Sequence, residues 1–136
     1  MARLLPRVDA LLVGILRPAL GPGVTVGTRI PDQMPLPFVM ARRAGGASIH
    51  PRFLDQALVD VQVWAGSDAE AEGLAQAVRD ALYEASTTPQ VIVPGMGYLS
   101  WFAEQAAPVL LPSDTEDHNV YRYQATYQIN TRPDLD

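Results

Sequence analysis

The chain has 136 residues, of which 48% are apolar and 18% charged. This composition gives enough hydrophobic material for one buried core and too little charge for a disordered tail. The sequence contains no cysteine, which excludes disulfides, thiolate metal sites and cysteine nucleophiles, and its net charge of -5 argues against wrapping nucleic acid by neutralising phosphates. We expect a single domain over residues 1–136, with no secretory cleavage pattern and no apolar run long enough to cross a membrane.

The charge is unevenly divided along the chain. Residues 1–54 hold seven arginines against two aspartates, a balance of +5, whereas residues 55–136 hold three arginines against thirteen acidic residues, a balance of -10. The two halves either pair within the folded monomer or give the subunit two oppositely charged sides, as head-to-tail rings require. The sequence leaves both interpretations open.

The first predicted elements are a helix, a short strand and a loop. Apolar residues recur at helical spacing from Leu4 to Leu16, and Pro18 with the glycines after it predicts the end of that helix. Val24 to Arg29 alternates as a short strand does. Residues 30–37 contain three prolines, each of which lacks an N–H, so they predict an extended loop.

Two further strands are expected in the middle of the chain. Phe38 to Arg43 predicts a strand and residues 44–47 a turn. Leu54 to Trp64 then alternates with period two, which predicts a strand of an antiparallel sheet that is covered on one side. Because Leu58 and Trp64 lie on the other, mostly polar side, that second face is also expected to contact something, such as a partner.

A second helix and two more strands complete the pattern. Ser67 and Glu70 form a capping box, and small apolar residues at helical spacing follow to Ala85. Residues 90–102 predict a bent or edge strand, because Pro94 and two glycines interrupt it. Residues 103–119 predict a long loop of the kind that often binds partners. Residues 121–130 alternate most clearly and predict the last strand.

These elements predict an α+β fold, with two helices packed on one face of a mostly antiparallel five-stranded sheet in the order α-β-β-β-α-β-β. The apolar faces of the helices and of the two best strands are expected to form one core. The predicted core residues are Leu12, Leu16, Val59, Val61, Leu74, Val78, Leu82, Tyr123 and Tyr127.

The sequence contains no motif of catalysis, and we predict no catalytic, cofactor-binding or metal-binding residues. No GxSxG occurs, and Pro94–Gly97 lacks the lysine and helix start of a phosphate loop. His118 lies beside three acidic residues, but the spacing of a calcium loop is absent, so a solvated acidic loop is expected there. These three acidic residues are Asp114, Glu116 and Asp117.

Three segments resemble one family of phage proteins. The strand of residues 57–66, the helix of residues 71–82 and the last strand, residues 120–133, are similar to the corresponding segments of tail-terminator proteins of long-tailed siphophages. The N-terminal helix, the short strand after it and the proline-rich loop are similar as well, so the resemblance covers most of the chain. It depends on the whole set of segments, because none of them is a chemical signature.

The resemblance implies a structural virion protein and not an enzyme. It implies a hexameric ring at the head-proximal end of the tail, assembled in the host cytoplasm, that contacts the major tail tube protein and a head-completion or neck protein. DNA would pass through the lumen without specific binding, and neither a membrane nor a cofactor is implied. The alternatives are another neck or connector subunit and, from a different class, a small α+β ligand-binding domain; a ring favours the first class and a monomer with a deep apolar pocket the last.

Candidate assembly residues follow from the charge asymmetry and from the proline-rich loop. Exposed apolar side chains in a loop that cannot enter a sheet are expected to contact a neighbour, and arginines of the first half are expected to meet acidic residues of the second half between subunits. The candidates are Arg29, Met34, Leu36, Phe38, Arg42, Arg43, Glu70, Glu72, Asp80 and Glu84.

Overall fold

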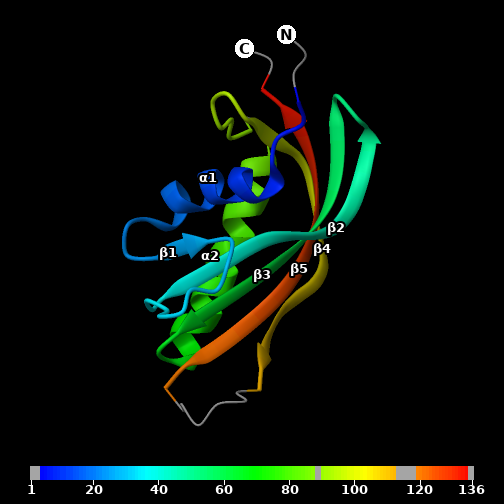
Figure 1. Cartoon of the computed structure of the whole chain (residues 1–136). Helices are drawn as coiled ribbons and strands as arrows, with labels where there is room; N and C mark the ends of the chain where they lie inside the picture. The colour runs from blue at the N-terminus through cyan, green and yellow to red at the C-terminus, as the bar shows by residue number, and fades with distance from the viewer. Residues whose placement is uncertain (1–3, 88–89, 113–118, 135–136) are drawn as a thin grey trace.

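The computed structural model describes residues 4–87, 90–112 and 119–134. Two helices cover one face of a five-stranded sheet of order β1-β2-β3-β5-β4 (Figure 1). Only β1 and β2 pair in parallel; the other neighbours are antiparallel. The elements are α1 (Val8–Leu20), β1 (Thr25–Gly27), β2 (Phe38–His50), β3 (Leu54–Ala65), α2 (Asp68–Ser86), β4 (Gly97–Leu111) and β5 (Tyr121–Pro133). This confirms the predicted α+β fold and its order.

The core lies between the two helices and the covered face of the sheet. The inward residues of β3 and β5 stand opposite each other, as at Val59 and Tyr127, and the apolar stripe of α2 packs on them. All nine residues predicted for the core are buried, and all belong to this one cluster. Period-two alternation in the strands and helical spacing in α1 and α2 are therefore sufficient to predict it.

Helix α1 differs from the prediction at both ends. It begins at Val8 and continues through Pro18 to Leu20, so the expected end at Leu16 is wrong. A proline in the last turn removes only one backbone hydrogen bond, and the helix can continue for the few residues that remain. Gly21 ends it: this glycine has a φ of 83° and its N–H donates to the Arg17 carbonyl.

The turn predicted at residues 44–47 is also wrong, because β2 continues through it. The register between β2 and β3 shifts between Arg43 and Gly45, as in a β-bulge. Gly46 is required there: its φ is 97°, and a Cβ would lie 2.2 Å from the Gln56 carbonyl oxygen. The hairpin instead turns at residues 51–53, which makes β2 and β3 a long arm at one end of the sheet (Figure 1).

Strand β4 is longer than expected, reaching Leu111 in place of the predicted loop from residue 103. It is an edge strand, paired only with β5, and its register shifts three times. Pro108 is tolerated because an edge strand has one side without ladder partners and because it lies where the register shifts between Ala106 and Val109. The proline and the shifts hid the strand from a pattern-based prediction.

A second, smaller cluster covers part of the opposite face of the sheet. Phe38, Met40 and Trp64 are buried together, with Met34 of the proline-rich loop and Val120 packed against them. The ring centroids of Phe38 and Trp64 lie 5.7 Å apart. The proline-rich loop of the same chain therefore covers Trp64, and this contact within the chain takes the place of the partner protein expected on this face.

Candidate assembly surfaces

Arg43 is bound within its own chain. Its guanidinium donates to both carboxylate oxygens of Asp55, at 2.6 and 2.9 Å, and to the Gly45 carbonyl oxygen at 2.9 Å. Its backbone N–H donates to the Asp9 carboxylate at 2.7 Å. Asp55 is almost fully buried, so the arginine compensates a carboxylate that water cannot reach. These contacts hold the β-bulge of β2 against α1. They also pair an arginine of the basic half of the chain with an aspartate of the acidic half inside the monomer.

Arg42 and Arg29 have different surroundings. Both side chains are exposed. Arg42 stands on the uncovered face of the sheet, opposite Asp60 of β3 in the register, and Arg29 lies just after β1. Of the three candidate arginines, these two are available for contacts with another molecule.

The apolar candidates in and beside the proline-rich loop also differ in how far they are buried. Phe38 is buried and Met34 is partly buried in the cluster with Trp64, so the expectation that both are exposed is wrong. The reason is that the loop folds back over the sheet face that no helix covers. Leu36 is 42% exposed and Ile30, in the same loop, is 54% exposed. Sequence reasoning missed Ile30.

The four acidic candidates on α2 are all exposed. Ser67 caps the helix as predicted, because its hydroxyl accepts the Glu70 N–H at 3.2 Å. Asp80 and Glu84 are four residues apart and lie together on the side of α2 that faces α1. Within the described part of the chain, neither side chain has a hydrogen-bond or ion-pair partner. The structure thus brings two of the four carboxylates to one place.

A groove runs between α1 and α2 at this place. Its volume is about 560 Å³. Its floor is apolar, and Asp80 and Glu84 are its only charged lining residues. The lining residues are Ile15, Pro18, Ala19, Ala77, Asp80, Ala81, Glu84, Ala85 and Val91. Small alanines on α2 leave this space open because they do not fill the gap between the helices.

The tip of the β2–β3 hairpin is a second apolar feature, which sequence reasoning missed. Ile49 is 58% and Phe53 54% exposed. His50 stacks on Phe53 with ring centroids 4.5 Å apart, and its Nδ1 accepts the Arg52 N–H at 3.2 Å. The signal in the sequence was two large apolar residues on either side of Pro51, but the turn had been placed too early along the chain.

The uncovered face of the sheet is polar around Asp60, and Trp101 and Val109 of β4 are exposed apolar residues on the same face. Asp60 accepts hydrogen bonds from Gln62 and Gln124, at 3.2 and 2.9 Å. Amides and hydroxyls of β5 continue the surface beside it, since Thr126 stands opposite Asp60 and Gln128 opposite Leu58. This face offers one hydrogen-bonded carboxylate, and no second acid or base is hydrogen-bonded to it.

Two tyrosines of β5 are held in their neutral form. The Tyr123 hydroxyl donates to Asp68 at the start of α2 at 2.5 Å, and this hydrogen bond, with burial, raises the pKa of Tyr123 to about 12. Burial, with the nearby Glu104, raises the pKa of Tyr127 to about 12. The Tyr127 hydroxyl has no hydrogen-bond partner among the described residues. The Tyr123 shift thus follows mainly from its hydrogen bond to Asp68, and the Tyr127 shift mainly from burial.

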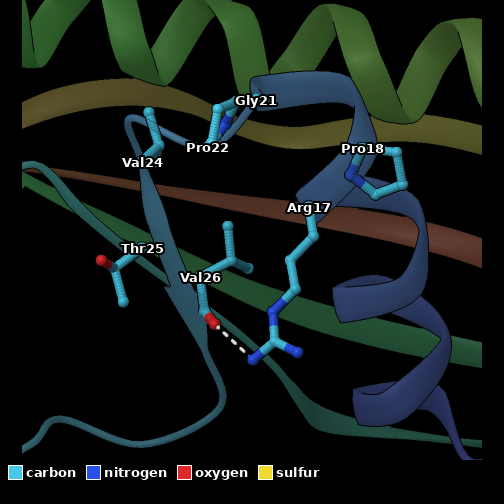
Figure 2. Close-up of a pocket in the computed structure, with 7 residues that line it drawn as sticks. All are labelled: Arg17, Pro18, Gly21, Pro22, Val24, Thr25 and Val26. Atoms are coloured by element: carbon cyan, nitrogen blue, oxygen red, sulfur yellow. Dashed lines mark hydrogen bonds between the residues drawn. The ribbon is translucent and has the colours of Figure 1, made fainter.

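A pocket beside the end of α1 has no catalytic character either. Figure 2 shows the Arg17 side chain reaching from α1 toward β1, where its guanidinium donates to the Val26 carbonyl at 3.1 Å. The other lining residues of this pocket of about 490 Å³ are apolar or small: Pro18, Gly21, Pro22, Val24, Thr25 and Val26. No acid, base or strong nucleophile lines it.

Among the residues that the structure describes, no group of three or more His, Cys, Asp or Glu side chains could hold a metal ion. The cluster of Asp114, Glu116, Asp117 and His118 lies outside the described residues. No helix in the described ranges is long and apolar enough to cross a membrane.

The comparisons give the class and then the family. Among solved structures, one chain of a "Virion of native gene transfer agent (GTA) particle" has the same fold, with a TM-score of 0.50 and 21% sequence identity over 93% of this chain and 87% of that chain. A search of curated proteins gave no match. The sequence profile described as phage tail termination protein matches residues 4–136. The chain belongs to this family, whose members are structural proteins of phage tails, and the resemblance seen in the sequence is confirmed.

Proposed function

We propose that the chain is the tail terminator itself: six copies form a ring on the head-proximal end of the tail tube and join it to a head-completion protein. The family match over residues 4–136 carries this proposal. The ring uses two different surfaces of each subunit, so that every copy contacts its two neighbours in the same way.

The edges of the sheet support assembly side by side. β1 pairs only with Phe38, Val39 and Met40 of β2, so the longer remainder of β2 has no strand on that side among the described residues. β4 is the opposite edge. Unpaired edges carry free N–H and C=O groups that bind other chains. The Asp9 carboxylate, by accepting the Arg43 N–H, occupies one of these groups.

The surfaces left for axial contacts are the exposed part of the proline-rich loop and the acidic start of α2. Leu36 and Ile30 contact the major tail tube protein or a neighbouring copy, and Glu70 and Glu72 lie beside the start of α2, free to meet basic partners. The net charge of -5 keeps DNA phosphates from adhering as the genome passes through the lumen. Assembly takes place in the host cytoplasm, before the tail joins the head.

A joining assay tests the proposal. Tails made without this protein are mixed with filled heads, with and without the purified chain, and joined particles are counted by electron microscopy. We expect joining only when the chain is present, together with tubes of uniform length. Joining at the same frequency without it would contradict a terminator role, and binding to heads alone would instead identify a neck subunit.

A further inference from the structure

Two apolar features of this chain carry opposite charges. The hairpin tip (residues 49–53) presents Ile49 and Phe53 with Arg52, whose guanidinium has no partner in the described part of the chain. The groove between α1 and α2 has an apolar floor and two unpaired carboxylates, Asp80 and Glu84. The hairpin tip thus supplies large apolar side chains and a positive charge, and the groove supplies an apolar floor and negative charges.

We propose that the hairpin tip of one copy docks into the helix groove of the next copy. Ile49 and Phe53 cover the alanine floor, and the Arg52 guanidinium lies against Asp80 and Glu84. This inference rests on the proposed ring. It names the residues on each of the two subunit surfaces that contact each other in that ring.

The two features cannot meet within one chain. The hairpin projects from the end of the sheet, away from the groove between α1 and α2 (Figure 1). A contact between two different surfaces of identical subunits is heterologous, and it forms a closed ring when the rotation between neighbours divides a full turn. A self-paired dimer through tips or through grooves is disfavoured, because it would set Arg52 against Arg52 or the two carboxylates against their own copies.

The hairpin tip has the rigidity that such docking needs. His50 stacks on Phe53, the Phe53 N–H donates to the His50 carbonyl at 3.2 Å, and the His50 ring accepts from Arg52. A turn that is already ordered loses little conformational entropy on binding. The β-bulge held by Arg43 and Asp55 lies at the base of the same hairpin, so the ion pair inside the monomer supports the contact between monomers without taking part in it.

Because the chain has no cysteine, thiol crosslinking can test this contact cleanly. One preparation carries Ser48→Cys, next to the tip, and a second carries Ala77→Cys, which lines the groove; both substitutions leave Ile49, Phe53, Arg52 and the two carboxylates in place. The mixture is assembled on isolated tail tubes and treated with a short bifunctional maleimide. We expect a dimer crosslinked between residues 48 and 77, identified by mass spectrometry.

The matched control is Gln76→Cys, an exposed neighbour of Ala77 that does not line the groove. We expect the yield from residue 77 to exceed the yield from residue 76 at least tenfold. Adding Ile49→Ser and Phe53→Ser to the Ser48→Cys chain should reduce it at least tenfold. Equal yields at 76 and 77 in rings that assemble normally would overturn the docking and leave the ring intact. Failure of the parent chain to bind tubes would instead defeat the proposed function itself.

Discussion

Arg42 and Arg43 are neighbours in one strand, yet they belong to different parts of the molecule. Arg43 points to the covered side, where it binds the buried Asp55; Arg42 points to the uncovered side and is exposed. The same contrast holds for the whole chain. One face of the sheet holds the core that makes the fold stable, while the hairpin tip and the outer surface of α2 are exposed, and we propose that they serve assembly. Substitutions on the covered side should therefore lower stability, whereas substitutions on the exposed surfaces should impair assembly.

The largest effect is expected in the core. Val78→Asp places an unpaired carboxylate on a fully buried position of α2, which should lower the free energy of unfolding by more than about 4 kcal/mol. The matched control is Gln76→Asp on the exposed side of the same helix. Denaturant unfolding followed by circular dichroism gives both values. If Val78→Asp unfolds at the denaturant concentration of the parent, α2 does not pack as described.

The two arginines allow a direct comparison. Arg43→Ala leaves Asp55 buried without its partner and should cost about 2–4 kcal/mol of unfolding free energy, whereas Arg42→Ala should cost less than about 0.5 kcal/mol. Adding Asp55→Ala to Arg43→Ala should restore part of the loss, because it removes the uncompensated charge. Equal values for the two single variants would show that the ion pair contributes nothing to stability.

High pH should destabilise the folded chain through its tyrosines. The pKa values of Tyr123 and Tyr127 are about 12 in the folded chain, against an ordinary value of 10.0. Their raised pKa values stabilise the fold fully below pH 10, and this contribution is lost as pH rises toward 12, because the unfolded chain ionises first. Urea midpoints measured at pH 8, 10 and 11 should therefore fall.

A variant assigns part of this pH effect to one residue. Tyr127→Phe should reduce the fall above pH 10, and at pH 8 it should change stability by less than about 1 kcal/mol, since the hydroxyl has no partner among the described residues. Tyr83→Phe, at an exposed position, is the control and should change neither. A steep pH dependence that persists when both Tyr123 and Tyr127 are replaced by phenylalanine would rule out these two groups as its cause.

The smallest effect on stability, and a larger one on assembly, is expected on the surface. Arg29→Glu with Arg42→Gln changes two exposed side chains, and glutamine is used at residue 42 to avoid a carboxylate opposite Asp60. The melting temperature should change by about 1 °C or less. Tail completion should slow severalfold at low salt and approach the parent rate at high salt, because exposed charges are screened over about 8 Å at physiological ionic strength. Normal completion at every salt concentration would show that these arginines serve only the monomer.

The sequence was sufficient for the fold because its strongest patterns lie in the elements that build the core. β3, β5 and α2 have the correct period, and seven of the nine residues predicted for the core are buried in these elements, the other two being Leu12 and Leu16 of α1. The errors occur where prolines or glycines are tolerated by their surroundings. Pro18 lies in a last helical turn, Gly46 just after a β-bulge and Pro108 in an edge strand, and each depends on neighbours that a local pattern does not include.

The candidate assembly surfaces were harder to predict from the sequence, because they too depend on contacts between distant segments. Composition showed that one half is basic and the other acidic, but not that Arg43 pairs inside the chain or that Phe38 lies under its own loop. The groove of α1 and α2 arises from two helices packed side by side, and the exposure of Ile49 and Phe53 depends on where the hairpin turns. Contacts between distant segments decide which charged and apolar residues remain for a partner.

The central claim is that this chain ends the tail as a ring, and cryo-electron microscopy of isolated, finished tails tests it most directly. We expect six copies of the chain at the head-proximal end of the tube, each with its β2–β3 hairpin reaching the α1–α2 groove of its neighbour. Density for this chain elsewhere in the particle, or a single copy at the end of the tube, would contradict it.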